Sequence, residues 1–365
     1  MLPPGSAAPW PQKVRFCEAP DGVRIAYAVH GSGPPLLIST CWLSHLQFDW
    51  ESPVWRHFLA ELGRFATIVR FDERGHGLSD WDVTDHSLAS RIGDLEAVAD
   101  DAGLERFALM AMAQGGPVAI SYAARHPARV SRLLFYDSYA DPQLGLTAED
   151  IELEEAFEQL IKAGWGRPES TFRRVFTSQM IPGATEEQKT WLDDLMRASV
   201  SASTAYLARQ QRKQASATEL LSTLRVPTLV LHALGDRMNN FAHGRHLASS
   251  IPGARLVPLE SENHILLHDE PAWAVFIEEV EQFLAPDRSA ATPPSAPRAA
   301  AVLSSRELEV LTLAADGQDN ADIAQALSLS VRTVERHLQN VYVKLGVQGR
   351  SARAAAVARL LTPAR

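Results

Sequence analysis

The sequence predicts an α/β fold with a helical insertion, followed by a small all-α domain. Three observations predict this architecture. Short apolar runs typical of buried strands alternate with helical patterns up to residue 284, and the strand signal disappears between residues 141 and 222. Beyond a segment rich in Pro, Ala and Ser, the rest of the chain has helical periodicity only. A length of 365 residues also favours two domains.

Six short apolar runs predict the buried strands of a mostly parallel sheet. Helical stretches such as SLASRIGDLEAVADDAG separate them, and this alternation implies helices on both faces of the sheet. The earlier run GVRIAYAVHG predicts an additional antiparallel edge strand. The six predicted strands are residues 34–40, 65–72, 107–112, 132–138, 227–233 and 254–260.

Two interruptions of this pattern set the expected domain boundaries. The helical stretch at residues 141–222 is large enough to form a cap over the carboxyl ends of the strands. The segment APDRSAATPPSAPRAAA, residues 285–301, has no apolar periodicity and predicts a semi-extended linker. We therefore expect an α/β domain with its cap at residues 1–284 and an all-α domain at residues 302–365.

The net charge of −9 conceals a difference between the two parts of the chain. Residues 1–286 carry 25 Lys and Arg against 37 Asp and Glu, a net charge of −12, whereas residues 287–365 carry ten against seven, a net charge of +3. Residues 328–365 alone hold seven basic residues and one acid. A local basic face in an acidic protein is typical of a DNA-binding module.

Composition also argues against several classes of protein. No apolar run approaches the eighteen or more residues of a membrane span, and the N-terminal stretch lacks the apolar segment of a secretion signal. Cys17 and Cys41 are too few for a disulfide framework, and no Cys-His cluster has zinc spacing. We expect a cytoplasmic protein that uses no membrane partner, metal or other cofactor.

The stretch ALMAMAQGGPVAISYAARHP, residues 108–127, has the pattern of a strand, a sharp turn and a helix. Two motifs, LLISTCW and RFDERGHGLSD, precede it in the chain. Two others follow it: PTLVLHALGD, which ends at Asp236, and ENH, which ends at His264. In this order the five motifs resemble an α/β-hydrolase with a helical cap, and the resemblance extends from residue 21 to residue 284.

The resemblance implies a role for each position of the site. The turn is the nucleophile elbow, whose serine position is Ala113 in this chain. The triad histidine is His264, and the triad acid is Asp236, with Asp137 as the alternative. A methyl group can neither attack a carbonyl nor be deprotonated, so covalent catalysis through position 113 is absent.

The resemblance also implies a ligand-binding shell around the elbow. Backbone N–H groups of Gln114 and Trp42 are the expected oxyanion donors, and His45 is expected near the mouth of the pocket. Cys41 lies on the oxyanion loop rather than at the elbow, so we interpret it as a loop or core thiol and not as a replacement nucleophile. Ala111 and Cys41 stand where active relatives carry glycine, which favours a site that has drifted away from catalysis.

The C-terminal stretch predicts a helix-turn-helix. A capping-box pattern of Ser304 and Glu307 begins one helix, which Gly317 ends. A second helix begins near the capping residue Asn320, and a third, capped by Ser330, extends from residue 331 to about 345. The motifs SSRELEVL, NADIA, SVRTVERH and KLGV closely resemble the LuxR-type DNA-binding domain, in which a fourth helix helps to pair two domains.

The third helix of this domain divides into two faces. Val334, Leu338, Val341 and Leu345 follow helical spacing and are expected in the core. The resemblance implies that three residues meet base edges and three others lie nearer phosphates. Many relatives carry Lys where this chain has Glu335, so their operator sequence cannot be transferred. The base-edge residues are Glu335, Arg336 and Gln339, and the phosphate residues are Arg332, Thr333 and Lys344.

Together the two parts favour a ligand-responsive transcriptional regulator. In this hypothesis the first domain holds a small, mainly apolar carbonyl, ester or lactone ligand without turning it over, and a homodimer binds double-stranded DNA. The alternative is a bifunctional serine hydrolase and regulator in which the serine at position 113 was replaced by alanine. A third hypothesis, a first domain that serves only as a scaffold for protein contacts, also remains open.

Overall fold

The computed structural model describes residues 11–39, 43–285, 303–315, 318–327, 329–345 and residue 356. The chain divides into two compact units, residues 1–286 and residues 287–365.

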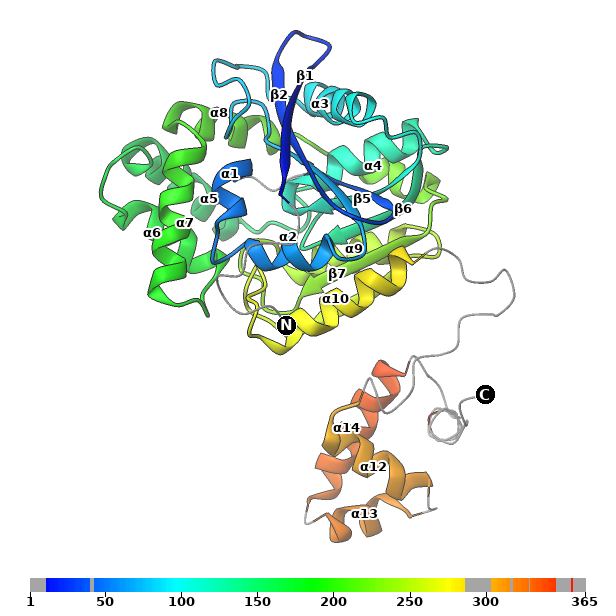
Figure 1. Ribbon diagram of the computed structural model, residues 1–365. Coiled ribbons are helices and arrows are strands. Elements are labelled where there is room, and N and C mark those ends of the chain that lie inside the picture. The colour runs from blue at the N-terminus through cyan, green and yellow to red at the C-terminus, as the bar shows by residue number, and fades with distance from the viewer. Residues whose placement is uncertain are drawn as a thin grey trace. The chain divides into compact units, whose positions relative to one another are not determined.

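An eight-stranded sheet forms the centre of the first unit (Figure 1). The two N-terminal strands pair antiparallel, the second of them also pairs antiparallel with β4, and every other pair is parallel. In spatial order the strands are β1 (Lys13–Glu18), β2 (Arg24–Gly31), β4 (Thr67–Phe71), β3 (Pro35–Ser39), β5 (Phe107–Met112), β6 (Val130–Tyr136), β7 (Thr228–Ala233) and β8 (Arg255–Leu259).

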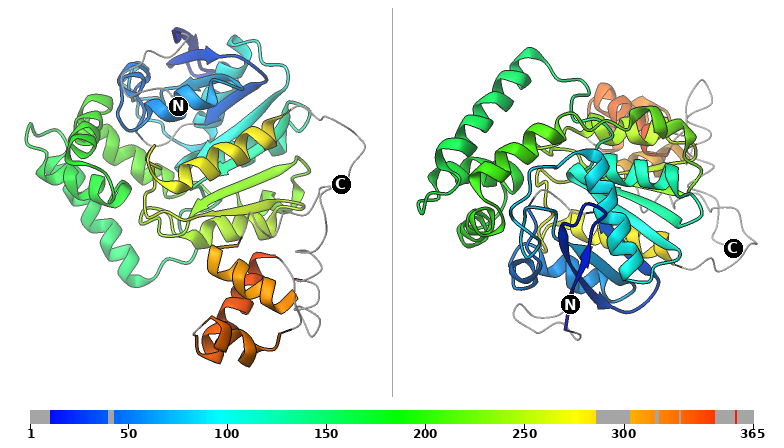
Figure 2. Two further views of the ribbon diagram at one scale, coloured as in Figure 1. Left: turned by 60° about the horizontal axis from the view of Figure 1, so that its bottom comes forward. Right: turned by 90° about the horizontal axis from the view of Figure 1, so that it is seen from above.

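Helices cover both faces of this sheet, as the α/β prediction requires (Figures 1 and 2). Side chains along each strand alternate between the faces: Leu36 and Ile38 of β3 pack with α2 (Arg56–Leu62) and α10 (Pro271–Leu284). Leu37 points to the opposite core, which α3 (Leu88–Asp101), α4 (Gly116–Arg125) and α9 (Phe241–Ser250) complete. A further short helix, α1 (Leu46–Trp50), follows β3.

The predicted α/β fold is confirmed, and the six predicted buried runs correspond to β3 through β8. The predicted edge strand needs a correction: β2 is antiparallel but lies second from the edge, because β1 covers it. The pattern of β1 gave no buried-strand signal, since five of its six residues are exposed, among them Phe16, 50% exposed. An edge strand with few buried side chains is held in the sheet by its backbone hydrogen bonds, and a pattern of apolar residues does not reveal such a strand.

Four helices are inserted between β6 and β7: α5 (Ala148–Gly164), α6 (Thr171–Met180), α7 (Glu186–Ser199) and α8 (Ala202–Arg212). Capping boxes begin two of them, at Thr147 for α5 and Thr185 for α7. Fully buried Trp165 and Phe176 pack their rings edge to face between these helices. The insertion therefore has its own apolar contacts, which are continuous with the core on one face of the sheet.

Three helices form the described part of the second unit: α12 (Ser305–Ala315), α13 (Asn320–Ala326) and α14 (Val331–Lys344). Ser304 and Glu307 form the predicted capping box, with the Ser304 N–H donating to the Glu307 carboxylate at 2.8 Å. The cap of α13 is Asp319 rather than the predicted Asn320, because the Asp319 carboxylate accepts from the N–H groups of Ala321 and Asp322. Gly317 lies outside the described residues.

The core of this unit confirms the apolar face predicted for the third helix. Val334, Leu338, Val341 and Leu345 are all buried. Of residues 346–365 the structure describes only Ala356, a buried helical residue that packs with Leu345 and its neighbours. Within the described part of both units, none of the helices has the length and apolar character needed to cross a membrane.

Candidate functional site

Position 113 lies at a sharp turn between β5 and α4. Ala113 has φ of 46°, a left-handed conformation that a residue with a Cβ adopts only where the surrounding structure enforces it. The following glycines allow the close packing of this turn, because a Cβ on Gly116 would come 1.9 Å from the carbonyl oxygen of Tyr139. The backbone therefore has the shape of a nucleophile elbow, with a methyl group at its apex.

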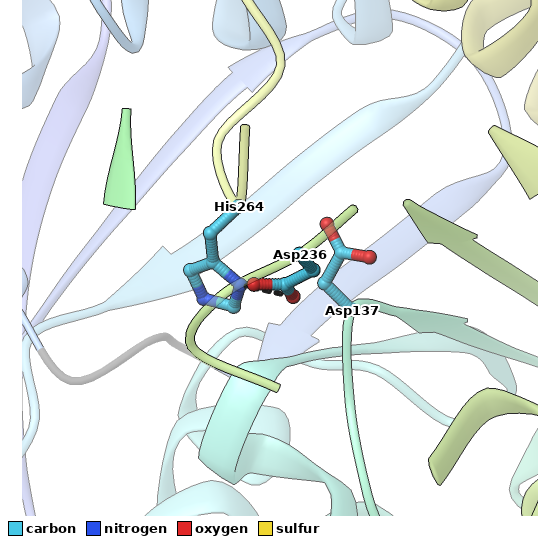
Figure 3. Close-up of side chains that lie close together, drawn as sticks. All are labelled: Asp137, Asp236 and His264. Atoms are coloured by element: carbon cyan, nitrogen blue, oxygen red, sulfur yellow. Dashed lines mark hydrogen bonds and ion pairs between the residues drawn. The ribbon is translucent and has the colours of Figure 1, made fainter. Parts of the chain in front are cut away.

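His264 and Asp236 lie beside this elbow and are joined by a hydrogen bond (Figure 3). His264 Nδ1 and Asp236 Oδ2 are 2.7 Å apart, and both residues are buried. The N–H groups of Met238 and Asn239 donate to Asp236 Oδ1, at 2.8 Å and 3.1 Å, and so orient the carboxylate. A carboxylate held at Nδ1 leaves the Nε2 atom of the imidazole for the ligand.

Two residues that the sequence did not single out hold the backbone of His264. The N–H of His264 donates to the carbonyl of Met180 in the helical insertion at 2.8 Å. The Tyr136 hydroxyl at the end of β6 donates to the His264 carbonyl and accepts from the N–H of Leu266, both at 2.9 Å. Tyr136 could have been noticed in the sequence because it directly precedes Asp137, whereas nothing local marks Met180.

The alternative acid, Asp137, lies beside Asp236 but does not hold the histidine (Figure 3). Its Oδ1 atom accepts from the N–H of Ala233 at 2.6 Å, and its Oδ2 atom has no partner among the described residues. Burial and the neighbouring charge of Asp236 raise the pKa of Asp137 well above its usual range. The geometry therefore favours Asp236 as the partner of His264.

Asp137, Asp236 and His264 are also a group whose ligand atoms lie within 4.8 Å of one another, close enough to surround a metal ion. Hydrogen bonds already engage both carboxylate oxygens of Asp236 and one atom each of Asp137 and His264. Among the described residues the group has only these three members, and its hydrogen bonds are those of an oriented acid and histidine pair.

A cavity of about 670 Å³ opens between the elbow and the helical insertion. Residues of the elbow and the acid and histidine pair line its inner part, and residues around α5 and α8 line the opposite wall. Polar and charged side chains occur on this wall, although the larger part of the exposed cavity lining is apolar. The inner lining includes Ala113, Gln114, Tyr139, Asp236 and His264, and Arg212 of α8 also lines the cavity.

A buried charge network connects the elbow to the insertion. Glu73 accepts from Arg91 at 2.8 Å and from the Gln114 side chain at 3.2 Å, and it forms an ion pair with Arg212 of α8. Burial by itself would raise the pKa of Glu73, but the charges of Arg212 and Arg91 outweigh it and lower that pKa. RFDERGHG contains Glu73, but its partners are distant in sequence and could not be foreseen.

Of the other predicted ligand-site residues that the structure describes, one lines the cavity and one does not. Gln114 lines the cavity, directly after Ala113. His45 is engaged elsewhere: its Nδ1 atom accepts from the N–H of Phe48 and caps α1, and it does not belong to the lining of the cavity. Cys41 and Trp42 lie outside the described residues.

In the second unit, α14 presents a polar face to solvent. Arg332, Glu335, Arg336 and Gln339 are exposed, while Thr333 is half-buried and its hydroxyl contacts that of the N-cap Ser330. Lys344 at the end of the helix forms an ion pair with Glu307 of α12 at 3.0 Å. All six predicted DNA-contact residues therefore lie on one helix, and four of them, Arg332, Glu335, Arg336 and Gln339, are exposed on its polar face.

The fold, the elbow and the ordered acid and histidine pair place the first unit among the α/β hydrolases, with alanine at the position of the attacking residue. The family model described as "Serine aminopeptidase, S33" matches residues 56–271, more than half of the chain. The chain belongs to this α/β-hydrolase family. The model of "Bacterial regulatory proteins, luxR family" matches residues 301–357, so the second unit is a LuxR-type DNA-binding domain.

Individual relatives agree with both assignments. The AB hydrolase superfamily protein YisY of Bacillus subtilis is 27% identical over 252 residues, 66% of this chain and 88% of its own length. The oxygen regulatory protein NreC of Staphylococcus aureus is 47% identical over 49 residues, 13% of this chain and 23% of its own length.

Two solved structures support the fold of the first unit. The esterase EaEST from Exiguobacterium antarcticum has a TM-score of 0.65 at 21% identity and covers 75% of this chain and 100% of its own. The enol-lactonase from Burkholderia xenovorans has a TM-score of 0.58 at 20% identity and covers 74% and 100%.

Proposed function

We propose that this protein is a ligand-responsive transcriptional regulator, whose hydrolase-fold domain holds a small carbonyl, ester or lactone ligand without turning it over. The LuxR-type domain binds operator DNA in the cytoplasm as part of a homodimer. Ligand bound under the helical insertion favours one arrangement of the two subunits, and the affinity for the operator changes with it.

One observation carries this proposal: the elbow retains its strained backbone, histidine and acid but has no attacking atom. A carbonyl beside Ala113 would meet the N–H of Gln114 and the imidazole of His264, which can bind its oxygen or a neighbouring group. The methyl group of Ala113 cannot form the covalent bond that begins hydrolysis. Such a site can bind a carbonyl compound, but it cannot hydrolyse the compound through position 113.

The second candidate function is a serine hydrolase joined to a regulator, with serine replaced by alanine at position 113. The hydrogen bond between His264 and Asp236 favours this candidate, because an oriented acid and histidine pair is the activating half of a triad. In that case the site would consume its effector whenever serine is present.

Operator binding tests the proposed function even while the ligand is unidentified. Duplexes selected from a random library by the full chain provide the operator. Affinity for it is then measured by fluorescence anisotropy with protein stripped of small molecules, before and after addition of an organic extract of the source cells. We expect a change of about fivefold or more, the usual range of allosteric coupling.

Two variants serve as controls for this measurement. Ala113→Trp fills the elbow end of the cavity, so the extract should no longer alter DNA affinity, whereas basal operator binding should persist because residues 303–345 are unchanged. Gln143→Ala shortens an exposed side chain of the cavity wall and should keep the response. An affinity that the extract leaves unaltered in the unsubstituted chain would contradict the proposed function.

A further inference from the structure

The part of the charged network that lies closest to the elbow, Arg91, Arg212 and Glu73, contains more positive than negative charge. Arg91 and Arg212 both pair with Glu73, and each arginine is buried. Neighbouring Arg74 is compensated separately, by buried Asp94 at 2.6 Å and by half-exposed Asp21 at 2.7 Å. Two guanidinium groups therefore share the single carboxylate of Glu73, which leaves a local excess of positive charge there; the second carboxylate of Arg74, Asp21, lies farther out and is half-exposed to water.

Other titratable groups beside this network do not balance the charge. Burial raises the pKa of Tyr139 to about 12, so its phenol is neutral. Burial also lowers the pKa of His76 to about 3 and that of His86 to about 4, so both imidazoles are neutral at pH 7. The excess positive charge therefore persists at neutral pH.

Arg212 brings this excess charge to the cavity. It lines the same cavity as Ala113, Gln114 and Tyr139. Its Nε atom is buried and has no hydrogen-bond partner among the described residues, and the same holds for Nε and Nη1 of Arg91. Buried guanidinium groups with unused donors are stabilised by an anion, and their planar fork matches a carboxylate.

The remaining cations of the cavity wall are already compensated. Arg209 pairs with Glu154 at 2.5 Å, Lys213 pairs with Glu158, and Arg237 pairs with Glu262 at 2.6 Å. Among these cations of the lining, Arg212 is therefore the one at which a bound anion would gain the most electrostatic free energy.

Another part of the cavity lining is apolar and exposed. Four large aliphatic side chains at the start of α5 and in the loop before it line the cavity, although 37–55% of each is accessible to solvent. Exposed aliphatic groups that border a cavity gain free energy when an apolar ligand covers them. These residues, which we name the apolar rim, are Leu144, Leu146, Ile151 and Leu153.

We propose that the cavity binds an amphiphilic monocarboxylate, with its carboxylate beside Arg212 and Gln114 and its aliphatic part against the apolar rim. This inference rests on the proposed function and specifies the class of its ligand. The local excess of positive charge at Arg212 matches a carboxylate head group, and the exposed aliphatic side chains of the apolar rim match an aliphatic chain.

Octanoate and its methyl ester are the matched probes, since they share the chain and the carbonyl and differ in charge. Binding to the full protein is measured by isothermal titration calorimetry. We expect octanoate to bind about tenfold or more tightly than methyl octanoate, the usual effect of a charge-assisted hydrogen bond. Arg212→Gln should abolish this preference and leave the affinity for the ester within about twofold.

Two further variants keep the test independent of folding. Glu73→Gln removes the carboxylate that competes for both arginines, so it should strengthen octanoate binding, which general damage to the site would not do. Arg237→Gln removes a solvent-exposed, paired charge from the same cavity wall and should leave the preference unchanged. Thermal melts check that each variant is folded.

Several results would overturn the inference: equal or tighter binding of the ester, a preference that survives Arg212→Gln, an equal loss in Arg237→Gln, or no binding of octanoate. If the ester binds more tightly, the ligand is neutral and the proposed function stands. If neither probe binds, the inference fails, and the operator measurement with cell extract decides the proposed function separately.

Discussion

Replacing Ala113 by serine restores one oxygen atom at the apex of the elbow. A small cavity of about 10 Å³ adjoins Ala113 and His264, which is about the space of one water-sized group. A serine hydroxyl therefore fits without moving its neighbours, and the backbone at φ of 46° is already that of the elbow. His264, held by Asp236 at 2.7 Å, is oriented to accept the proton.

We expect the Ala113→Ser variant to hydrolyse p-nitrophenyl butyrate at least about a hundredfold faster than the unsubstituted chain, because a positioned general base contributes about 10²–10⁴ in rate. Release of p-nitrophenol is followed by absorbance, and acylation of the serine is followed by intact-protein mass spectrometry. The double variant Ala113→Ser/His264→Ala is the control and should lose the gain. A variant without added activity, or activity that survives in the double variant, would refute our interpretation of this geometry.

Four further predictions concern stability and DNA recognition. Leu338→Ala should destabilise the second unit by about 2–5 kcal/mol in urea denaturation, because Leu338 is only 3% exposed, and a loss below about 1 kcal/mol would contradict its core role. Arg336→Ala should relax the base preference at one position of each half-site in a duplex selection, and an unchanged profile would refute that assignment. Gly116→Ala should lower the melting temperature of the first unit, because its Cβ would come 1.9 Å from the Tyr139 carbonyl oxygen; an unchanged melting temperature would argue against that packing. Burial and a nearby arginine lower the pKa of His76 to about 3. As the pH falls below about 6.5, the unfolded state therefore binds a proton that the folded state does not, and the free energy of unfolding decreases. His76→Gln should reduce this decrease between pH 7 and pH 5, and an unaltered slope of the urea midpoint against pH would contradict the assignment.

The sequence was sufficient for features that depend on local patterns. Buried parallel strands appear as short apolar runs because both of their faces are covered, and β3 through β8 were predicted for this reason. The elbow could be located because the strand, the glycine pair and the helix are contiguous. The core of α14 could also be predicted, since Val334, Leu338 and Val341 repeat with helical spacing.

Other features depend on contacts between distant segments, and the sequence could not reveal them. Glu73 is followed in the chain by Arg74, yet its ion-pair partners are Arg91 and Arg212. The arginine in the cavity lining was missed for the same reason, because Arg212 comes from an inserted helix whose orientation is set by packing. His45 lies among aromatic residues in the sequence, but its ring caps the helix that follows it.

The central claim is that the elbow site holds its ligand intact. Native mass spectrometry of the full chain, isolated from its source cells beside the Ala113→Ser variant, tests this claim most directly. We predict one intact small molecule bound per unsubstituted chain, and its cleavage product, or no ligand, with Ala113→Ser. An unsubstituted chain that carries no small molecule, or that converts the molecule it binds, would contradict the claim.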